Sequence, residues 1–223
     1  MHAYTAIIIE PRKHKALAFV LQNFLENLSE DWGFTIFHGQ SNKEYILDII
    51  HALPAYKHRF QKLVQLNVDN LNQSEYSELF KTKEFYDCID TDIFLNFQTD
   101  ALILKEHKDL LNLFLQYDYV GAPWNNTFVG NGGLSLRKKS KMLEILRTVP
   151  KTTSNEDIFF CTENKTVPMH RPPFELAKLF SVETVFSEIS FGIHNIWRWL
   201  PINEIEYIVK KHKDVGRLIE LNK

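Results

Sequence analysis

The sequence predicts an α/β fold in which a mostly parallel central sheet is flanked by helices. Over roughly the first hundred residues, short apolar runs alternate with segments of helical periodicity, and only a few residues connect one to the next. The run at residues 5–10, TAIIIE, is apolar up to its last residue and is stopped by Pro11. Such a run is typical of a strand that is buried on both faces of a parallel sheet.

The other elements of the first half follow the same logic. Residues 14–28 place apolar side chains at helical spacing, and residues 34–38 form a second apolar strand that Gly39 ends. The remaining elements predicted here are a helix at 43–52, a strand at 60–68, a helix at 74–80 and a strand at 93–97.

Beyond residue 100 the pattern loosens, and a smaller subregion is expected. Strands are predicted at residues 119–122, 134–136 and 185–186, and helices at residues 110–115, 138–149, 155–163 and 205–221. A further short helix is expected beyond Pro172. No glycine- or serine-rich linker, low-complexity run or internal repeat interrupts the sequence, so we expect a single domain over residues 1–223.

The composition limits the class of protein. Of the 223 residues, 44% are hydrophobic and 24% are charged, which is ordinary for a soluble globular protein. The formal net charge of −2 argues against a nucleic-acid-binding surface. Cys88 and Cys161 show neither metal-ligand spacing nor a disulfide framework, which favours a reducing compartment. Because no apolar run approaches the roughly eighteen residues of a membrane span, we expect a soluble cytoplasmic protein.

The first candidate functional residue is Asp100, the last residue of LNFQTD. Gln98, Thr99 and Asp100 interrupt an apolar, β-prone run that resumes at Leu102. In open α/β sheets, ligands bind outside the carboxyl ends of the strands, so Asp100 is placed where a ligand or a metal would lie. A capping residue or a solvated turn is the alternative for a single acid.

The second candidate is the glycine cluster at Gly130, Asn131, Gly132 and Gly133, which holds three of the eight glycines of the chain. Glycine permits positive φ and lets a backbone approach a ligand closely. The alternative is a tight turn between two strands. The cluster matches neither a Walker phosphate loop nor the GxGxxG fingerprint.

The third candidate is a pair of adjacent acids, Glu156 and Asp157, in front of the apolar run at residues 158–160. With Ser154 or Asn155 as the helix cap, both acids lie in a first helical turn, where the helix dipole stabilises negative charge. The functional alternative is a general base, because a carboxylate within hydrogen-bond reach of a substrate hydroxyl can accept its proton. Both interpretations stay open at this point.

The fourth candidate is His194, within SFGIHN. A single histidine in an apolar neighbourhood is often a core residue, although imidazole is also a common metal ligand. His194 becomes a candidate because it follows the strand-end acid, the glycine cluster and the acid pair in the sequence.

Taken in order, these four features resemble the landmarks of GT-A-fold nucleotide-sugar glycosyltransferases. The segments FQTD, YDYVGAPW, GNGGLSLR, NEDIFF and SFGIH together resemble a small, poorly characterised family of glycosyltransferase-like proteins found in bacteria and large DNA viruses. The resemblance covers nearly the whole chain in element order. It implies a GT-A-like domain in which residues 1–100 bind the nucleotide and residues 101–223 bind metal, sugar and acceptor. A viral member would act in the host cytoplasm.

The resemblance also implies a metal site. Asp100 matches the last acid of the DxD motif, which binds the divalent metal that bridges the donor diphosphate. His194 matches the late histidine that contacts the metal or the diphosphate. Oxygen ligands with one imidazole suit Mn²⁺, with Mg²⁺ as a substitute. Such a metal neutralises the leaving nucleoside diphosphate.

The remaining site residues are implied in the same way. Gly132 and Gly133, with Asn131, would line the sugar and acceptor pocket. Asp157, with Glu156 beside it, matches the acid motif that holds the acceptor hydroxyl. The implied donor-binding residues are Glu10, Pro11, Arg12, Gln98, Thr99 and Asp100.

One residue departs from the family pattern, because Gln98 stands where the DxD motif has its first acid. An amide can bond a ribose hydroxyl but adds no charge, so metal binding is expected to depend on the nucleotide or on a further ligand such as Asp92. Trp124, beside Pro123, either stacks on a sugar ring of the substrate or packs against the protein with no role in binding. The stereochemistry is open, although direct displacement with Asp157 as the base would invert the anomeric carbon.

The leading hypothesis is a metal-dependent glycosyltransferase. It would move a hexose or deoxyhexose from a nucleoside-diphosphate sugar, with UDP as the expected nucleotide, to a hydroxyl of a glycan or glycoprotein. The second hypothesis, motivated by Gln98, is a degenerate transferase fold that binds nucleotide or glycan without turnover. The third is a sugar-phosphate nucleotidyltransferase, but Pro11, Arg12 and Lys13 stand where its glycine-rich, basic signature would follow the first strand.

Overall fold

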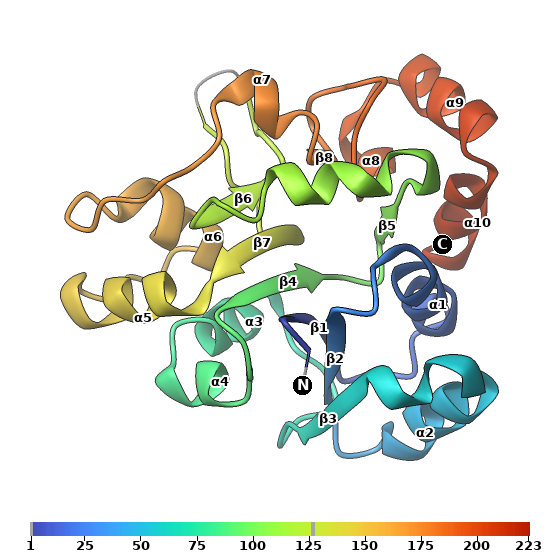
Figure 1. Ribbon diagram of the computed structural model, residues 1–223, viewed down its shortest axis with the longest axis horizontal. Coiled ribbons are helices and arrows are strands. Elements are labelled where there is room, and N and C mark those ends of the chain that lie inside the picture. The colour runs from blue at the N-terminus through green and yellow to red at the C-terminus, as the bar shows by residue number, and fades with distance from the viewer. Residues whose placement is uncertain (1, 126–127) are drawn as a thin grey trace.

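The computed structural model describes residues 2–125 and 128–223. Its centre is a six-stranded sheet in the order β3-β2-β1-β4-β7-β6 (Figure 1). The strands are β1 (Tyr4–Glu10), β2 (Trp32–His38), β3 (Phe60–Gln65), β4 (Ile93–Phe97), β6 (Tyr119–Gly121) and β7 (Leu134–Lys138). β1 pairs in parallel with β2 and β4, and β2 with β3, whereas β7 runs antiparallel to β4 and β6. This sheet confirms the predicted α/β class with mostly parallel strands.

A second, three-stranded sheet has the order β5-β9-β8. Its strands are β5 (Ala101–Ile103), β8 (Ser181–Val182) and β9 (Gly192–His194). β9 pairs antiparallel with β5 and parallel with β8. The predicted strand at residues 185–186 is wrong, because it is residues 181–182 that pair with β9.

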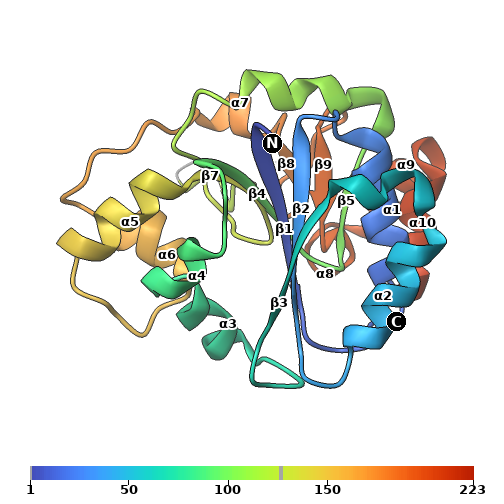
Figure 2. The same ribbon diagram turned by 60° about the horizontal axis from the view of Figure 1, so that its bottom comes forward.

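Helices cover both faces of the six-stranded sheet (Figure 2). On one face lie α1 (Leu17–Asn27) and α2 (Lys43–Ala52), and on the other α3 (Gln73–Leu79), α4 (Lys83–Asp87), α5 (Lys139–Thr148) and α6 (Glu156–Ile158). The last two helices, α9 (Ile202–Lys211) and α10 (Lys213–Leu221), lie beside α1 and the second sheet. The shorter elements are a 3₁₀ turn at Pro54–Arg59, α7 (Phe174–Ala177) and α8 (Ile196–Trp199). Within the described part of the chain, every helix is too short or too polar to cross a membrane.

Three helix predictions need correction. The predicted helix at 205–221 is two helices, because His212 adopts an extended backbone with φ −126° and ψ 92° between α9 and α10. Of the helix expected at 110–115, residues 110–113 belong to a 3₁₀ helix at Lys105–Leu113 and the rest to a turn. The helix expected at 155–163 is the short α6 followed by a π-helical turn at Phe159–Glu163, and the side chain of Asn155 makes no capping hydrogen bond.

The apolar side chains of the central strands alternate between two cores, one on each face of the sheet. On β1, Ala6 and Ile8 belong to one core, whereas Ile7 and Ile9 belong to the other. This alternation follows from the pleat, which turns successive side chains to opposite faces. It explains why β1 is apolar at every position from residue 6 to residue 9.

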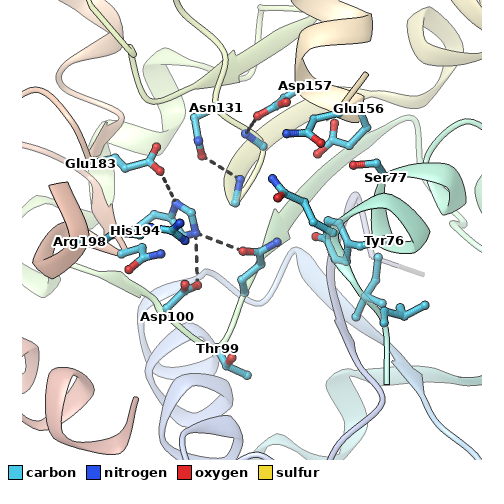
Figure 3. Close-up of a pocket in the computed structure, with 18 of the residues that line it drawn as sticks. Tyr76, Ser77, Thr99, Asp100, Asn131, Glu156, Asp157, Glu183, His194 and Arg198 are labelled. Atoms are coloured by element: carbon cyan, nitrogen blue, oxygen red, sulfur yellow. Dashed lines mark hydrogen bonds and ion pairs between the residues drawn. The ribbon is translucent and has the colours of Figure 1, made fainter. Parts of the chain in front are cut away.

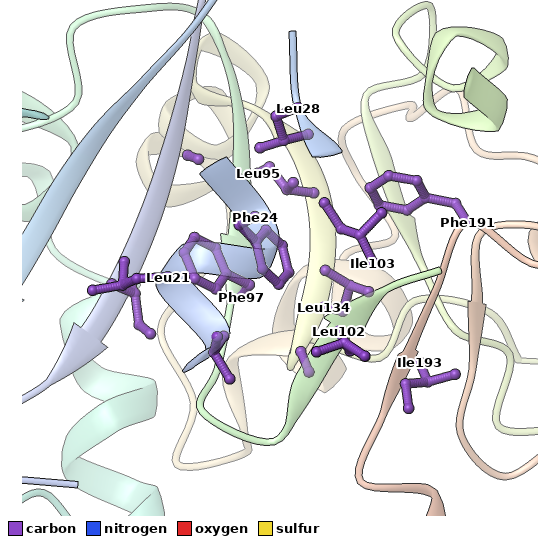
Figure 4. Close-up of a cluster of buried hydrophobic side chains, with 14 of the residues drawn as sticks. Leu21, Phe24, Leu28, Leu95, Phe97, Leu102, Ile103, Leu134, Phe191 and Ile193 are labelled. Carbon is purple, nitrogen blue, oxygen red and sulfur yellow. The ribbon is translucent and has the colours of Figure 1, made fainter. Parts of the chain in front are cut away.

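The first core fixes the end of β4. Phe24 of α1 stacks on Phe97, the last residue of β4, with 3.8 Å between the ring centroids (Figure 4). The amide of Asn23, also on α1, donates to the backbone oxygen of Ile103 and accepts from its nitrogen. The turn at residues 98–100 is therefore anchored on both sides, by β4 and by β5.

The sheet topology brings three segments to one edge. β1 ends at Glu10, and the parallel strand β4 ends beside it. β7 is antiparallel, so its beginning lies at this same edge, and its first residue Leu134 pairs with Phe97 of β4. The turn after β4 therefore meets the glycine loop before β7, as the sequence predicts for a ligand-binding edge.

Candidate functional site

A cleft of about 840 Å³ lies at this edge of the sheet. The cleft is lined by most of the residues that the sequence proposed for the site, although not by Gly130 of the glycine cluster: Glu10, Pro11, Arg12, Gln98, Thr99, Asp100, Trp124, Asn131, Gly132, Gly133, Glu156, Asp157 and His194. Figure 3 shows Asp100 and His194 on one side of the cleft and Glu156 and Asp157 on another. The structure thus brings together residues that the sequence separates by more than a hundred positions.

His194 connects β9 to the turn that follows β4. Its Nε2 lies 3.2 Å from Oδ1 of Asp100 and 3.1 Å from Oε1 of Gln98 (Figure 3). The strand pairing accounts for this contact, because His194 is opposite Ala101, the residue that follows Asp100. The predicted association of the strand-end acid with the late histidine is therefore present as a direct contact.

Glu183 completes this side of the cleft and was missed by the sequence analysis. Its Oε1 lies 3.2 Å from Nδ1 of His194, so the imidazole stands between two carboxylates. The set Gln98, Asp100, Glu183 and His194 is called the histidine wall below. Glu183 follows β8, and only the pairing of that two-residue strand reveals its position, so no signal in the sequence singled it out.

The charges of the histidine wall stabilise one another. Burial by itself would lower the pKa of His194, but the charge of Asp100, reinforced by Glu183, raises it to about 10. Burial opposes the ionisation of Asp100, yet the charge of His194 lowers the pKa of this carboxyl. At neutral pH the two side chains form an ion pair.

The donor atoms of the histidine wall fit a divalent cation. A carboxylate oxygen, an amide oxygen and an imidazole nitrogen are the mixture of ligands that suits Mn²⁺. Oδ1 of Asp100 is buried and, apart from its ion pair with His194, has no hydrogen-bond partner, so it has a lone pair to offer a cation. Among residues 2–125 and 128–223, no group of three His, Cys, Asp or Glu side chains could hold a metal ion. A cation bound here would need further ligands from a bound molecule.

The glycine loop between β6 and β7 is held from beneath by polar side chains. The backbone oxygen of Gly132 accepts hydrogen bonds from Nδ2 of Asn96 at 2.8 Å and from Oγ of Ser135 at 2.9 Å. The nitrogen of Gly133 donates to Oδ1 of Asn131 at 2.9 Å. Both interpretations of the cluster hold in part, since it is a turn between two strands and it also lines the cleft.

Two positions of this loop have no room for a side chain. A Cβ at Gly133 would lie 2.1 Å from the ring of His194, and a Cβ at Gly132 would lie 2.2 Å from Oε1 of Glu156. The loop therefore packs directly against both sides of the cleft, which explains why glycine occurs here.

Glu156 takes part in a buried ion pair with Arg137. The guanidinium donates to both carboxylate oxygens, at 2.8 and 3.0 Å, and both side chains are almost completely buried. The rings of Phe80 and Tyr119 lie on the guanidinium, with centroids 4.6 and 4.7 Å from its carbon. Because both oxygens of Glu156 are engaged, this residue is placed to hold the loop and its neighbour Asp157.

Asp157 lies at the cleft with one carboxylate oxygen on the glycine loop. Oδ2 accepts from the nitrogen of Gly132 at 3.3 Å, and Oδ1 accepts from the nitrogen of Ile158 at 2.8 Å. Burial, followed by the charge of Glu156, raises the pKa of Asp157 to about 7. A carboxyl that titrates near neutral pH is suited to accept a proton. The set Gly132, Arg137, Glu156 and Asp157 is called the glycine wall below.

The end of β1 forms a fixed corner of the cleft. The buried carboxylate of Glu10 accepts from Nε and Nη2 of Arg12, both at 2.8 Å. Nδ2 of Asn42 donates to the backbone oxygens of Glu10 at 2.9 Å and Arg12 at 2.8 Å. These bonds hold the segment around Pro11 in one conformation, so the corner is rigid.

Further lining residues were not singled out from the sequence: Asn70, Leu71, Asn72, Gln73, Tyr76, Ser77, Thr184, Arg198 and Trp199. Trp199 is 50% exposed at the cleft. Trp124 lines the cleft as well, and its backbone oxygen accepts from Oγ1 of Thr184 at 3.0 Å. An exposed tryptophan is unusual, but the sequence alone cannot tell which tryptophans are exposed.

Asp92 does not belong to the site. It immediately precedes β4, at the opposite end of that strand from Asp100, and its Oδ1 accepts from the nitrogen of Ser140 at 2.8 Å. It is absent from the cleft lining. The suggestion that Asp92 supplies the missing carboxylate is therefore wrong.

Residues 60–194, more than half of the chain, match the family described as "Protein of unknown function (DUF5672)". The chain belongs to this family. The matched DUF5672 segment includes the histidine wall and the glycine wall, whereas the corner at the end of β1 precedes it. A comparison with curated proteins found no match to the sequence.

The fold of this DUF5672 member is similar to that of glycosyltransferases. The mannosyltransferase PcManGT from Pyrobaculum calidifontis, solved with GDP-Man and Mn²⁺, has a TM-score of 0.53 and 12% identity over 77% of this chain and 55% of that chain. The glycosyltransferase GlyE of Streptococcus pneumoniae has a TM-score of 0.53 and 10% identity over 86% and 54%. TarS of S. aureus has a TM-score of 0.55 and 9% identity over 94% and 38%. The chain thus spans about half of these proteins or less, and the likeness shows a shared fold.

Proposed function

We propose that this chain is a divalent-metal-dependent glycosyltransferase. It would move a hexose or deoxyhexose from a nucleoside-diphosphate sugar, with UDP as the expected nucleotide, to a hydroxyl of a glycan or glycoprotein. The observation that carries the proposal is the single cleft in which an Asp100–His194 pair faces a carboxyl, Asp157, whose pKa lies near neutrality. The shared fold with glycosyltransferases supports the same reaction class.

The proposed donor site lies between the end of β1 and the histidine wall. The rigid corner at Glu10 and Arg12 would border the nucleotide base, and Gln98 would bond a ribose hydroxyl. Asp100 and His194 would hold the divalent cation. When bound, such a cation supplies Lewis-acid assistance to the departure of the nucleoside diphosphate. Residues 1–100 would thus carry the nucleotide, and residues 101–223 the sugar and acceptor.

The proposed acceptor site lies at the glycine wall. Asp157 would accept the proton of the acceptor hydroxyl as the oxygen attacks the anomeric carbon. Its hydrogen bond from the nitrogen of Gly132 orients the carboxylate. The ion pair of Glu156 with Arg137 holds the backbone next to Asp157 in place. Glu156 is therefore proposed as a positioning residue for Asp157. Trp124 and Trp199 would offer ring faces to a sugar.

The first test is thermal unfolding of the purified protein with UDP, GDP and CMP, each with and without Mn²⁺. A ligand at about a hundred times its dissociation constant stabilises the fold by roughly 2.7 kcal/mol, a shift of ~5–10 °C for a chain of this size. We expect one nucleotide to shift the transition and Mn²⁺ to enlarge the shift. Asp100→Asn should remove the contribution of Mn²⁺, and the matched control Asp109→Asn, at an exposed position, should keep it. No shift with any nucleotide would contradict the proposal.

A second candidate is a protein that binds nucleotide or glycan without turnover. Gln98 favours it, because an amide, rather than a second carboxylate, lies next to Asp100 at Nε2 of His194. A cation bound there would be held by one negative charge instead of two. The discriminating measurement is release of nucleoside diphosphate from the nucleotide sugar that stabilises the fold most. Release that depends on Mn²⁺ and is lost in Asp157→Asn supports the transferase. Binding without release supports the second candidate.

A further inference from the structure

Glu183 is a buried carboxylate at the cleft with no role in the function proposed above. The residue is 3% exposed, and its Oε1 lies 3.2 Å from Nδ1 of His194. Its other oxygen, Oε2, is buried without a hydrogen-bond partner. Figure 3 shows Glu183 and Asp100 on different sides of the His194 ring.

The second sheet places these residues in adjacent positions. β8 and β9 are parallel, and Ser181 and Val182 pair with Gly192 and Ile193, so Glu183, the residue that follows β8, comes beside His194. The segment is also fixed beyond Glu183, because Oγ1 of the following residue Thr184 donates to the backbone oxygens of Pro123 and Trp124. The position of Glu183 beside the imidazole is therefore a consequence of strand register.

The two nitrogens of His194 face different partners. Nε2 faces Oδ1 of Asp100 and Oε1 of Gln98, whereas Nδ1 faces Glu183. The Glu183 carboxylate beside Nδ1 keeps a proton on that nitrogen and restrains rotation of the ring, so that a cation bound against Asp100 would take the place of the proton on Nε2.

A purely structural ion pair would look different. The Arg137–Glu156 pair of the same cleft has both carboxylate oxygens hydrogen-bonded, whereas Glu183 keeps one oxygen without such a partner. Nδ1 of His194 also lacks an aligned hydrogen bond, although it lies within ion-pair distance of Glu183. Such buried, incompletely satisfied groups are rare in native proteins and point to a ligand that completes them.

We propose that Glu183 is a positioning residue that holds the His194 ring with Nε2 directed at a divalent cation bound against Asp100. This inference rests on the metal dependence proposed above. It adds a residue whose side chain contacts the metal ligand rather than the metal itself. Groups of this kind raise the affinity of a site for its metal by 10- to 100-fold in general.

The test measures Mn²⁺ binding directly, from the electron paramagnetic resonance signal of free Mn²⁺, with UDP, GDP and CMP each present in excess. Glu183→Gln keeps the shape of the side chain and removes its charge. The matched control is Glu188→Gln, which makes the same change at an exposed position of the same segment. We expect Mn²⁺ to bind Glu183→Gln roughly 10- to 100-fold more weakly than the wild type. The control variant, and the stabilisation of both variants by nucleotide without metal, should match the wild type.

The outcomes separate this inference from the proposed function. If the wild type binds Mn²⁺ with none of the nucleotides, the metal dependence itself fails, and this inference with it. If the wild type binds Mn²⁺ and a folded Glu183→Gln binds it equally well, Glu183 is structural only, and the inference alone is overturned. Glu183→Asp, which keeps the charge, should recover part of the affinity.

A measurement on the wild type covers the case in which the Glu183 variants do not fold. Long-range ¹H–¹⁵N spectra of the imidazole rings, recorded with nucleotide and diamagnetic Mg²⁺, report which nitrogen carries the proton. The signal of His194 is assigned by its loss in His194→Asn. We expect a proton on Nδ1 and none on Nε2. The opposite tautomer would overturn the inference.

Discussion

The two walls of the cleft both bury charged side chains, but their hydrogen bonding differs. On the glycine wall, Arg137 and Glu156 satisfy each other, and the guanidinium also donates to Oγ of Ser135. On the histidine wall, Oδ1 of Asp100 and Oε2 of Glu183 accept no hydrogen bond. The first arrangement is complete within the protein, whereas the second is not.

This difference in hydrogen bonding indicates which wall has a structural role and which wall binds a ligand. A buried charge costs free energy unless its partners compensate for the lost water, so an incomplete set persists where a ligand supplies the missing contacts. The glycine wall therefore acts as scaffold for the one carboxyl that it presents, Asp157. The histidine wall is the surface on which a cation and a diphosphate are expected.

The largest expected effect comes from breaking the complete pair. Arg137→Met leaves Glu156 buried without its partner, which should lower the free energy of unfolding by roughly 3–5 kcal/mol, measured by urea denaturation. In Arg137→Met combined with Glu156→Met, no uncompensated charge remains, and most of this loss should be recovered. A double variant as unstable as the single one would show that the pair does not account for the stability.

A pH-dependent effect is expected at Asp157. Well below pH 4 the carboxyl is protonated in both the folded and the unfolded chain. As the pH rises through 4 towards 7, the unfolded chain ionises while burial keeps the folded carboxyl protonated. The wild type should therefore lose stability relative to Asp157→Asn, by as much as ~4 kcal/mol between pH 4 and pH 8. Urea denaturation of both proteins at several pH values measures this difference. A difference that does not change with pH would show that the pKa of Asp157 is not raised.

An added negative charge on the histidine wall should strengthen its binding of Mn²⁺. Gln98→Glu places a carboxylate near Nε2 of His194, where the amide oxygen now lies at 3.1 Å. Mn²⁺ binding without nucleotide should tighten by about tenfold, roughly 1.4 kcal/mol, as measured by calorimetric titration. Gln116→Glu, an exposed position, is the control. Unchanged binding in Gln98→Glu would place the cation away from Gln98.

The smallest effect is expected where the histidine wall meets the loop that carries Trp124. Oγ1 of Thr184 donates to the backbone oxygens of Pro123 at 2.9 Å and Trp124 at 3.0 Å. Thr184→Val keeps the shape and removes this donor, at a cost of about 1 kcal/mol, which corresponds to a fall in Tm of ~2–4 °C. Scanning calorimetry measures the change, and an unchanged Tm would show that the bond is replaced by water.

Long elements with one clear period were predictable from the sequence. The helix at Lys43–Ala52 and the strand at Ile93–Phe97 have the predicted bounds, because helical spacing and a continuous apolar run act locally. The strand β8 has only two residues and no measurable period, so it was placed four residues too late. The break at His212 was missed because the polar run at residues 210–214 contains neither glycine nor proline and has apolar residues at helical spacing on both sides.

Site residues that lie in short, distinctive motifs were predictable from the sequence. Site residues that are brought together only by strand pairing were not. The segments around Asp100, Gly132, Asp157 and His194 drew attention by composition, and all of them line the cleft. Glu183 lies beside His194 only because of the register of β8 with β9, and no local sequence pattern predicts that register. In the same way, the sequence could not show that Glu156 is paired with Arg137.

The pairing of β9 with β5 has a consequence for how the protein is made. Gln98 and His194 are 96 positions apart, so a growing chain carries the strand Ala101–Ile103 long before its partner is synthesised. During that interval an apolar strand edge is open to other chains, which favours aggregation. Translation that stalls between residues 103 and 192 should therefore yield nascent chains that depend on chaperones.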